Sequence, residues 1–116
     1  MISPAEFDSL VEEALEQLPK RFADLLDNVV IVVEEEPTDE DLDAVDGDEL
    51  LGLYRGVAMT RRSHNMLPAL PDQIAIFRGP ILRVARTRRQ AVREIRETVI
   101  HELGHYFGLH DGDMVY

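Results

Sequence analysis

The segment from His101 to Asp111 carries the residues of this chain that could do chemistry. It reads H-E-x-x-H followed by x-x-G-x-x-D. Histidines four positions apart stand on the same face of a helix, so the imidazoles of His101 and His105 can reach one metal ion. Glu102 can take a proton from a water molecule bound to that metal. The spacing therefore predicts a metal-assisted hydrolytic site.

The third metal ligand is left open by the residues themselves. Gly108 comes three positions after His105 and can end the helix and turn the chain back. His110 and Asp111 follow as neighbours and are both good zinc ligands, and Asp113 is a weaker third candidate. Because the chain contains no cysteine, a zinc site must use histidine and carboxylate ligands.

The residue types also predict a mechanism. Three protein ligands leave a fourth position for water, and zinc lowers the pKa of that water to about 7. Glu102 would take the proton and pass it to the leaving amine, while a peptide carbonyl near the metal is polarised for attack. The three fixed residues of H-E-x-x-H also occur by chance on ordinary surface helices. Here the match lies on a helix with an independent apolar face, which favours the zinc-dependent peptidase.

Two long helices and three strands are expected to position this site. Ser3-Pro4-Ala5-Glu6 is a capping-box start, and Thr87-Arg88-Arg89-Gln90 starts a last helix over about 88–108. A long loop is expected over 56–71, with a break at Gly79-Pro80. The strand candidates are Val29–Val33, Leu50–Tyr54 and Ile74–Phe77. The short helical candidates are Lys20–Leu26, Asp39–Ala44 and Ile81–Ala85.

The last helix is predicted to bury one face and present the motif on another. Its apolar positions recur at helical spacing, and His101 and His105 lie opposite or to the side of them. Thr98, one turn before the motif, is interpreted as a helix-surface threonine. The apolar positions are Val92, Ile95, Val99, Leu103 and Tyr106.

The charge is unevenly distributed along the chain. The net charge is −11, with 17 acidic and 2 basic residues in 1–49 but 6 acidic and 10 basic residues in 50–116. The acidic half argues against nucleic-acid binding by bulk electrostatics. Arg89, Arg93 and Arg96 share a helix face, which we interpret as a solvated surface that meets the acidic N-terminal half.

The motif and two further segments resemble the minimal zincin family of small bacterial metallopeptidases. The resemblance rests on the HExxHxxGxxDxxM pattern from His101 to Met114. It extends to Leu51–Gly56 and Pro71–Pro80, and so covers most of the chain from about residue 29. Two positions depart from the family pattern. Ala58 stands where a proline is frequent, and His110 stands beside Asp111, the metal ligand that the family pattern implies.

The resemblance implies an α/β zincin-like fold, with a small mixed sheet packed against the N-terminal helix and the motif helix. It implies zinc held by His101, His105 and Asp111, with Glu102 as the general base. It also implies that an extended peptide substrate lies along an edge strand above the motif helix. That edge strand would be either Leu50–Tyr54 or Ile74–Phe77.

The length and composition bound the remaining expectations. A chain of 116 residues with 45% apolar residues fits one domain over 1–116. The resemblance implies that this domain is a zincin-like metallopeptidase domain of α+β or α/β class. Residues 1–20 lack the pattern of a signal peptide, and no apolar run approaches the roughly 20 residues needed to cross a bilayer. We expect a cytoplasmic monomer with no membrane or nucleic-acid partner. The alternatives are a catalytically inactive zincin-fold binding or regulatory protein, and an arginine-face nucleic-acid module.

Overall fold

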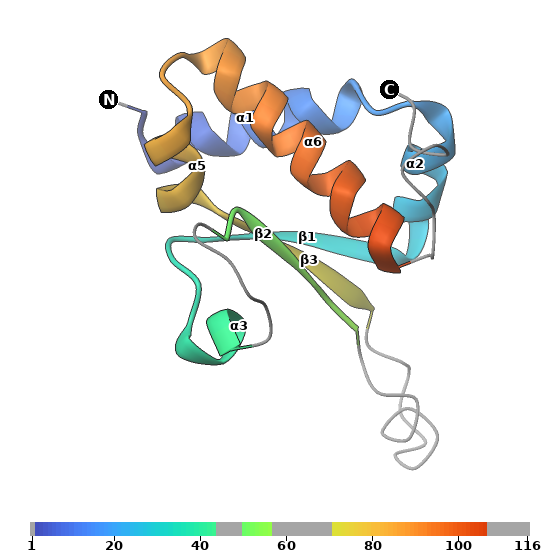
Figure 1. Ribbon diagram of the computed structural model, residues 1–116. Coiled ribbons are helices and arrows are strands. Elements are labelled where there is room, and N and C mark those ends of the chain that lie inside the picture. The colour runs from blue at the N-terminus through green and yellow to red at the C-terminus, as the bar shows by residue number, and fades with distance from the viewer. Residues whose placement is uncertain (1, 44–49, 57–70, 107–116) are drawn as a thin grey trace.

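The computed structural model describes residues 2–43, 50–56 and 71–106 and has two layers. Helices α1 (Pro4–Glu16) and α6 (Arg88–Tyr106) cross over one face of a small sheet (Figure 1). The short helix α3 (Asp39–Asp43) lies on the opposite side of the sheet. The α+β class predicted from the sequence is therefore confirmed. Within the described residues, no helix is both long enough and apolar enough to cross a membrane.

The sheet of the described residues is mixed and has the strand order β1-β3-β2. β1 (Val29–Glu34) runs parallel to the central β3 (Asp72–Phe77), and β2 (Gly52–Arg55) runs antiparallel to it. A central strand is covered on both faces, and residues 74–77 of β3 have no exposed surface. β2 therefore lies at an edge of this sheet, next to α6.

Helix α1 begins where the capping box predicts. The Ser3 hydroxyl accepts a hydrogen bond from the Glu6 amide at 3.2 Å, and the Glu6 carboxylate accepts one from the Ser3 amide at 3.5 Å. Pro19 separates α1 from the short helix α2 (Lys20–Leu25), which is followed by the 3-10 turn η1 (Leu26–Asn28). The apolar stripe of α1 is buried and consists of Phe7, Leu10, Val11 and Ala14.

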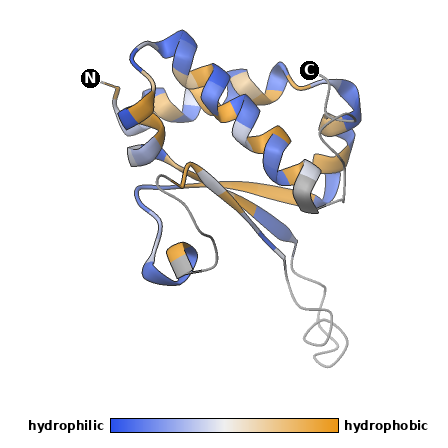
Figure 2. Ribbon diagram, in the orientation of Figure 1, coloured by the Kyte–Doolittle hydropathy of each residue, from blue (hydrophilic) through white to orange (hydrophobic). Residues whose placement is uncertain are grey.

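The core lies between the two long helices and the sheet. The apolar face predicted for α6 is buried as far as Leu103, and it packs against α1 and β3. Figure 2 shows hydrophobic residues along the strands and alternating with hydrophilic ones along α6. Since one face of α6 is used for packing, the motif residues are left on another face.

One predicted boundary is wrong. Gly79 and Pro80 were expected to break the chain before a helix over Ile81–Ala85, but helix α5 (Arg78–Val84) already begins at Arg78. The proline is tolerated because it is the third helical residue, and the first-turn amides have no partner within their own helix. The other short helical candidates, α2 and α3, are present.

Candidate active site at the carboxyl end of helix α6

The first part of the motif, His101 to His105, lies in the last turns of α6, as predicted. The helix is continuous to Tyr106, so His101 and His105 stand four positions apart on one helical segment. The His101 side chain is exposed, and Glu102 is half-buried. The side chain of His105 and the whole of Asp111 lie outside the described residues, as do the competing ligand candidates His110 and Asp113.

Glu102 reaches the backbone of the edge strand β2. The Phe77 amide donates to Leu51 O at 2.9 Å, so these two residues form a hydrogen-bonded pair. Along antiparallel strands such as β2 and β3, hydrogen-bonded and non-hydrogen-bonded residue pairs alternate. Tyr54, opposite Ile74, then falls in a non-hydrogen-bonded pair whose amide points away from β3. That amide donates to Glu102 Oε1 at 2.9 Å. The predicted general base is therefore placed at the outer edge of β2, where an added strand would bind.

The Tyr54 side chain is fixed by a second contact. Its hydroxyl donates to Asp72 Oδ2 at 2.8 Å, across the antiparallel pair of β2 and β3. The ring is half-buried and packs against the core cluster. These contacts hold the Tyr54 ring in the packing between the sheet and the helices.

Close packing between β2 and α6 brings the two elements together. A Cβ atom on Gly52 would lie 2.5 Å from Thr98 Cγ2 and 2.8 Å from the carbonyl oxygen of Ala75. Thr98 is 9% exposed, and its hydroxyl donates to Glu94 O at 2.6 Å, so the prediction of a helix-surface threonine is wrong. A glycine within a strand is a sign of close backbone approach, and this signal was present in the sequence.

An ion-pair cluster fixes the end of β2 from the other face of the sheet. Arg55 donates to both carboxylate oxygens of Glu34 at 2.7 and 2.9 Å and to Asp41 at 2.9 Å. The hydrogen bonds from Arg55 lower the pKa of Glu34. Burial of Asp41 raises its pKa, but the amide of Thr38 and the guanidinium of Arg55 outweigh burial, so the pKa is lowered overall. Arg55 also lies over the ring of Phe77, at 5.9 Å from its centre.

The donor types at this end of α6 fit zinc. Imidazole nitrogens are preferred zinc donors, and two of them on consecutive helical turns can share one ion. Within the three described ranges, no three side chains of His, Asp or Glu are grouped to hold a metal. Those ranges contain the His101 side chain but neither the His105 side chain nor Asp111. The complete predicted ligand set therefore lies partly outside the described residues.

The comparisons with known proteins identify the family. The chain matches the zincin-like metallopeptidases over residues 26–116 and therefore belongs to that family. Among solved structures it is similar to a conserved hypothetical protein from Thermo thermophilus, at 26% identity and a TM-score of 0.58. The similarity covers 91% of this chain and 94% of that one. No curated protein matches this chain. The family predicted from the motif is confirmed.

Proposed function

We propose that this protein is a zinc-dependent peptidase that uses Glu102 as its general base. The proposed zinc ligands are His101, His105 and Asp111. One observation supports the proposal most strongly: the Glu102 carboxylate lies 2.9 Å from an outward-facing amide of the edge strand β2. A base in that place is next to a peptide bound along β2. Membership of the zincin-like metallopeptidases supports the same class of reaction.

The residues of the chain have separate tasks in this proposal. Zinc, when bound, supplies a Lewis acid that lowers the pKa of water and polarises a carbonyl. The imidazoles of His101 and His105 would hold the ion, with the carboxylate of Asp111 as the third protein ligand. Glu102 would take a proton from the water that attacks the peptide carbonyl, and would pass that proton to the amine released when the C–N bond breaks.

The substrate is proposed to be an extended peptide that adds to β2 as a further strand. Such binding uses main-chain hydrogen bonds for affinity. The Tyr54 amide points in the direction required, and its present partner is the Glu102 carboxylate. A substrate carbonyl that takes over this amide would release Glu102 for proton transfer. Substrate binding and availability of the base are thereby coupled.

The decisive test of the proposal is the Glu102→Gln variant. Glutamine keeps an oxygen that can accept from the Tyr54 amide, so the edge strand remains held while the base is lost. We expect hydrolysis of a mixed peptide library by the zinc-loaded protein to fall by about 10²–10⁴-fold. Mass spectrometry of the products measures the rate, and metal analysis checks that zinc content is unchanged. Hydrolysis that survives at the original rate would exclude the mechanism.

Two Tyr54 variants test the substrate strand. Tyr54→Pro removes the amide donor, and Tyr54→Ala is the matched control because both lose the ring and its contact with Asp72. Proline is tolerated on edge strands whose amide faces outward. We expect Tyr54→Pro to raise the KM for peptides about tenfold above that of Tyr54→Ala, the effect of one hydrogen bond. Equal KM values in the two variants would show that substrate does not use this amide.

The second candidate is an inactive binding protein with a zincin fold. It is favoured by the same hydrogen bond, because a glutamate held by a strand amide can serve packing alone. The candidates differ in the Glu102→Gln experiment: the inactive protein binds peptides equally well with either residue and hydrolyses none with either.

A further inference from the structure

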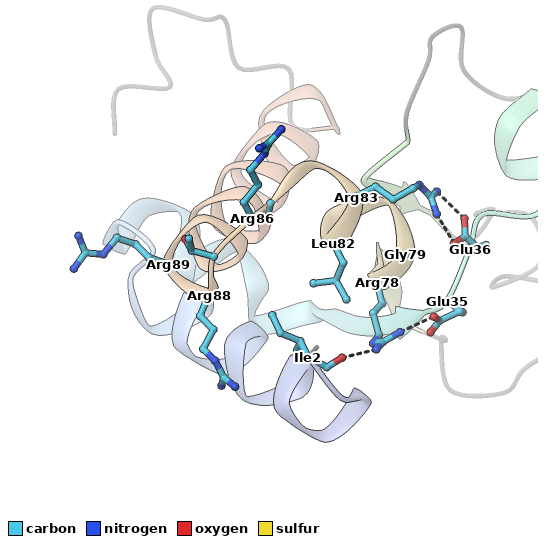
Figure 3. Close-up of a pocket in the computed structure, with 12 residues that line it drawn as sticks. Ile2, Glu35, Glu36, Arg78, Gly79, Leu82, Arg83, Arg86, Arg88 and Arg89 are labelled. Atoms are coloured by element: carbon cyan, nitrogen blue, oxygen red, sulfur yellow. Dashed lines mark hydrogen bonds and ion pairs between the residues drawn. The ribbon is translucent and has the colours of Figure 1, made fainter.

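A cavity lies at the opposite end of α6, where α5 meets the first turn of that helix (Figure 3). Its volume is about 970 Å³, which falls within the range of small-molecule sites. Residues from the start of the chain, from the segment after β1 and from both helices line it. Five arginines contribute to the lining: Arg78, Arg83, Arg86, Arg88 and Arg89.

Two of these arginines are neutralised within the lining itself. Arg83 makes a two-pronged pair with Glu36 at 2.8 and 2.9 Å. Arg78 donates to Glu35 at 2.6 Å and to the carbonyl oxygen of Ile2 at 2.6 Å. These pairs tie α5 to the segment after β1 and to the start of the chain. They form a fixed wall of the cavity (Figure 3).

The other three arginines leave the lining with a surplus of positive charge. Arg88 pairs with Glu6 of α1, which is not part of the lining. Arg86 and Arg89 are exposed, and among the described residues their guanidinium groups have no hydrogen-bond or ion-pair partner. Figure 3 shows both side chains pointing outward, in different directions from one another and away from Leu82. Side chains of this length can close over a bound anion.

The lining also has an aliphatic part. Ile2, Leu82 and Ala85 contribute to it, and Figure 3 shows Leu82 lying between the arginines. All three are partly exposed, so their apolar surface is accessible from the cavity. An apolar surface beside several guanidinium groups matches a ligand that has an anionic group and an organic body.

We propose that this cavity binds a small organic phosphate of about nucleotide size. The planar guanidinium fork matches phosphate oxygens in a two-pronged geometry. Two forks without a partner in the described part of the chain, those of Arg86 and Arg89, belong to residues that line the cavity, and rotation about their side-chain bonds can turn both toward a ligand. The phosphoryl groups bind there, and the organic body lies against Leu82 and Ile2. Nothing in this proposal depends on peptidase activity.

The charge of the whole protein selects a small anion over a polymer. The net charge is −11, so a long polyanion is repelled by the rest of the surface. Because Arg86 and Arg89 are exposed to solvent, a compact phosphate bound to them is largely screened from charges further than about 8–10 Å away at physiological salt. The local surplus then dominates its binding.

The proposed site is separate from the motif end of α6. From Arg89 to His101 the helix rises about 18 Å, at about 1.5 Å per residue. A ligand in the cavity therefore does not contact the proposed zinc ligands. Binding at the two ends can be measured independently.

Isothermal titration of the full chain with ADP tests the proposal, with adenosine and pyrophosphate as the comparison ligands at constant ionic strength. We expect saturable binding of ADP to one site, weaker binding of pyrophosphate and no measurable binding of adenosine. The Arg86→Gln/Arg89→Gln variant should weaken ADP binding by roughly tenfold or more, since each charged hydrogen bond contributes about that factor.

The matched control is Arg21→Gln/Arg93→Gln, which removes two exposed charges from outside this cavity. It should change the Kd by less than about twofold, because distant surface charges are screened. His101→Ala should bind ADP as the unmodified chain does. The proposal is overturned by a lack of saturable ADP binding at millimolar concentration. Equal weakening in the two double variants, or loss of binding in His101→Ala, would also overturn it.

Discussion

The two ends of helix α6 use charge in different ways. At the amino end, Arg88 pairs with Glu6 from α1. Near the carboxyl end, the Glu102 carboxylate binds a neutral strand amide, that of Tyr54. A charged side chain held by an opposite charge is already neutralised. One held by a single amide can exchange that partner for another proton donor, so the carboxyl end is the better place for chemistry.

The acidic first half of the chain supplies the partners of the arginines near the amino end of α6. Glu35 and Glu36 pair with arginines of α5, and Gln17 accepts from Arg96. Of the three arginines predicted to meet the acidic N-terminal half, only Arg96 is seen to contact it, through the neutral side chain of Gln17. Among the described residues, Arg89 and Arg93 make no ion pair with an acidic side chain. The carboxyl end contacts β2 instead, and it does so through tight packing and one hydrogen bond.

Tight packing should make the carboxyl half of α6 the more sensitive region for stability. Gly52→Ala places a Cβ 2.8 Å from the Ala75 carbonyl oxygen and 2.5 Å from Thr98 Cγ2. We expect the free energy of unfolding to fall by about 2–3 kcal/mol, as for overpacked cores. Urea denaturation measures it. Adding Thr98→Ser should recover part of the lost stability, because serine lacks the Cγ2 methyl group. Recovery stays partial because the contact with the Ala75 carbonyl oxygen remains. An unchanged stability of Gly52→Ala would contradict the close packing of β2 and α6.

Removing Arg55 should have a smaller effect that depends on pH. Arg55→Met leaves the carboxylates of Glu34 and Asp41 without their cation, and we expect a loss of about 1–2 kcal/mol near pH 7, less than for a fully buried pair. Both carboxyl pKa values are lowered in the folded state. Their stabilisation is therefore present above the unfolded-state values of 4.5 and 3.8 and is lost as pH falls through the folded-state values.

Thermal unfolding of Arg55→Met and the unmodified chain across this range checks the sign. The difference in Tm should shrink on acidification below about pH 4, where both carboxyls begin to protonate. A difference that grows on acidification would contradict the assignment of the cluster.

The smallest effect is expected at the amino end. Arg88→Gln removes the partner of Glu6, and the pair is accessible to solvent, with the Arg88 side chain 64% exposed and that of Glu6 37% exposed. Exposed ion pairs contribute little to stability, so the Tm should stay close to that of the unmodified chain. Peptide hydrolysis should also be unchanged, since Arg88 lies far from Glu102 along α6. A larger loss of stability in Arg88→Gln than in Gly52→Ala would contradict the expectation that the carboxyl half of α6 is the more sensitive region for stability.

Local signals were sufficient to predict most elements. The capping box at Ser3 and the spacing of apolar residues in α1 and α6 depend on neighbours in the sequence, and both are confirmed. The run of valines predicted β1, which extends one residue further, to Glu34. The start of α5 was missed because the rule that proline breaks a helix does not hold within the first turn.

The contacts between distant segments could not be predicted in the same way. The hydrogen bond from Tyr54 to Glu102 joins residues 48 positions apart, and it depends on the pairing register of β2. Burial of Thr98 depends on the approach of Gly52, which only the strand order brings near. The motif predicted which residues do chemistry, whereas the position of the edge strand required the fold. The roles of His101, His105 and Asp111 as ligands stay predictions.

The most direct test of the account is anomalous scattering at the zinc absorption edge from a crystal of the zinc-loaded protein. The proposed zinc site requires one anomalous-scattering peak at the carboxyl end of α6. That peak should lie within bonding distance of imidazole nitrogens of His101 and His105 and of a carboxylate oxygen of Asp111. A peak elsewhere, or one to which neither imidazole is bonded, would contradict the proposed active site.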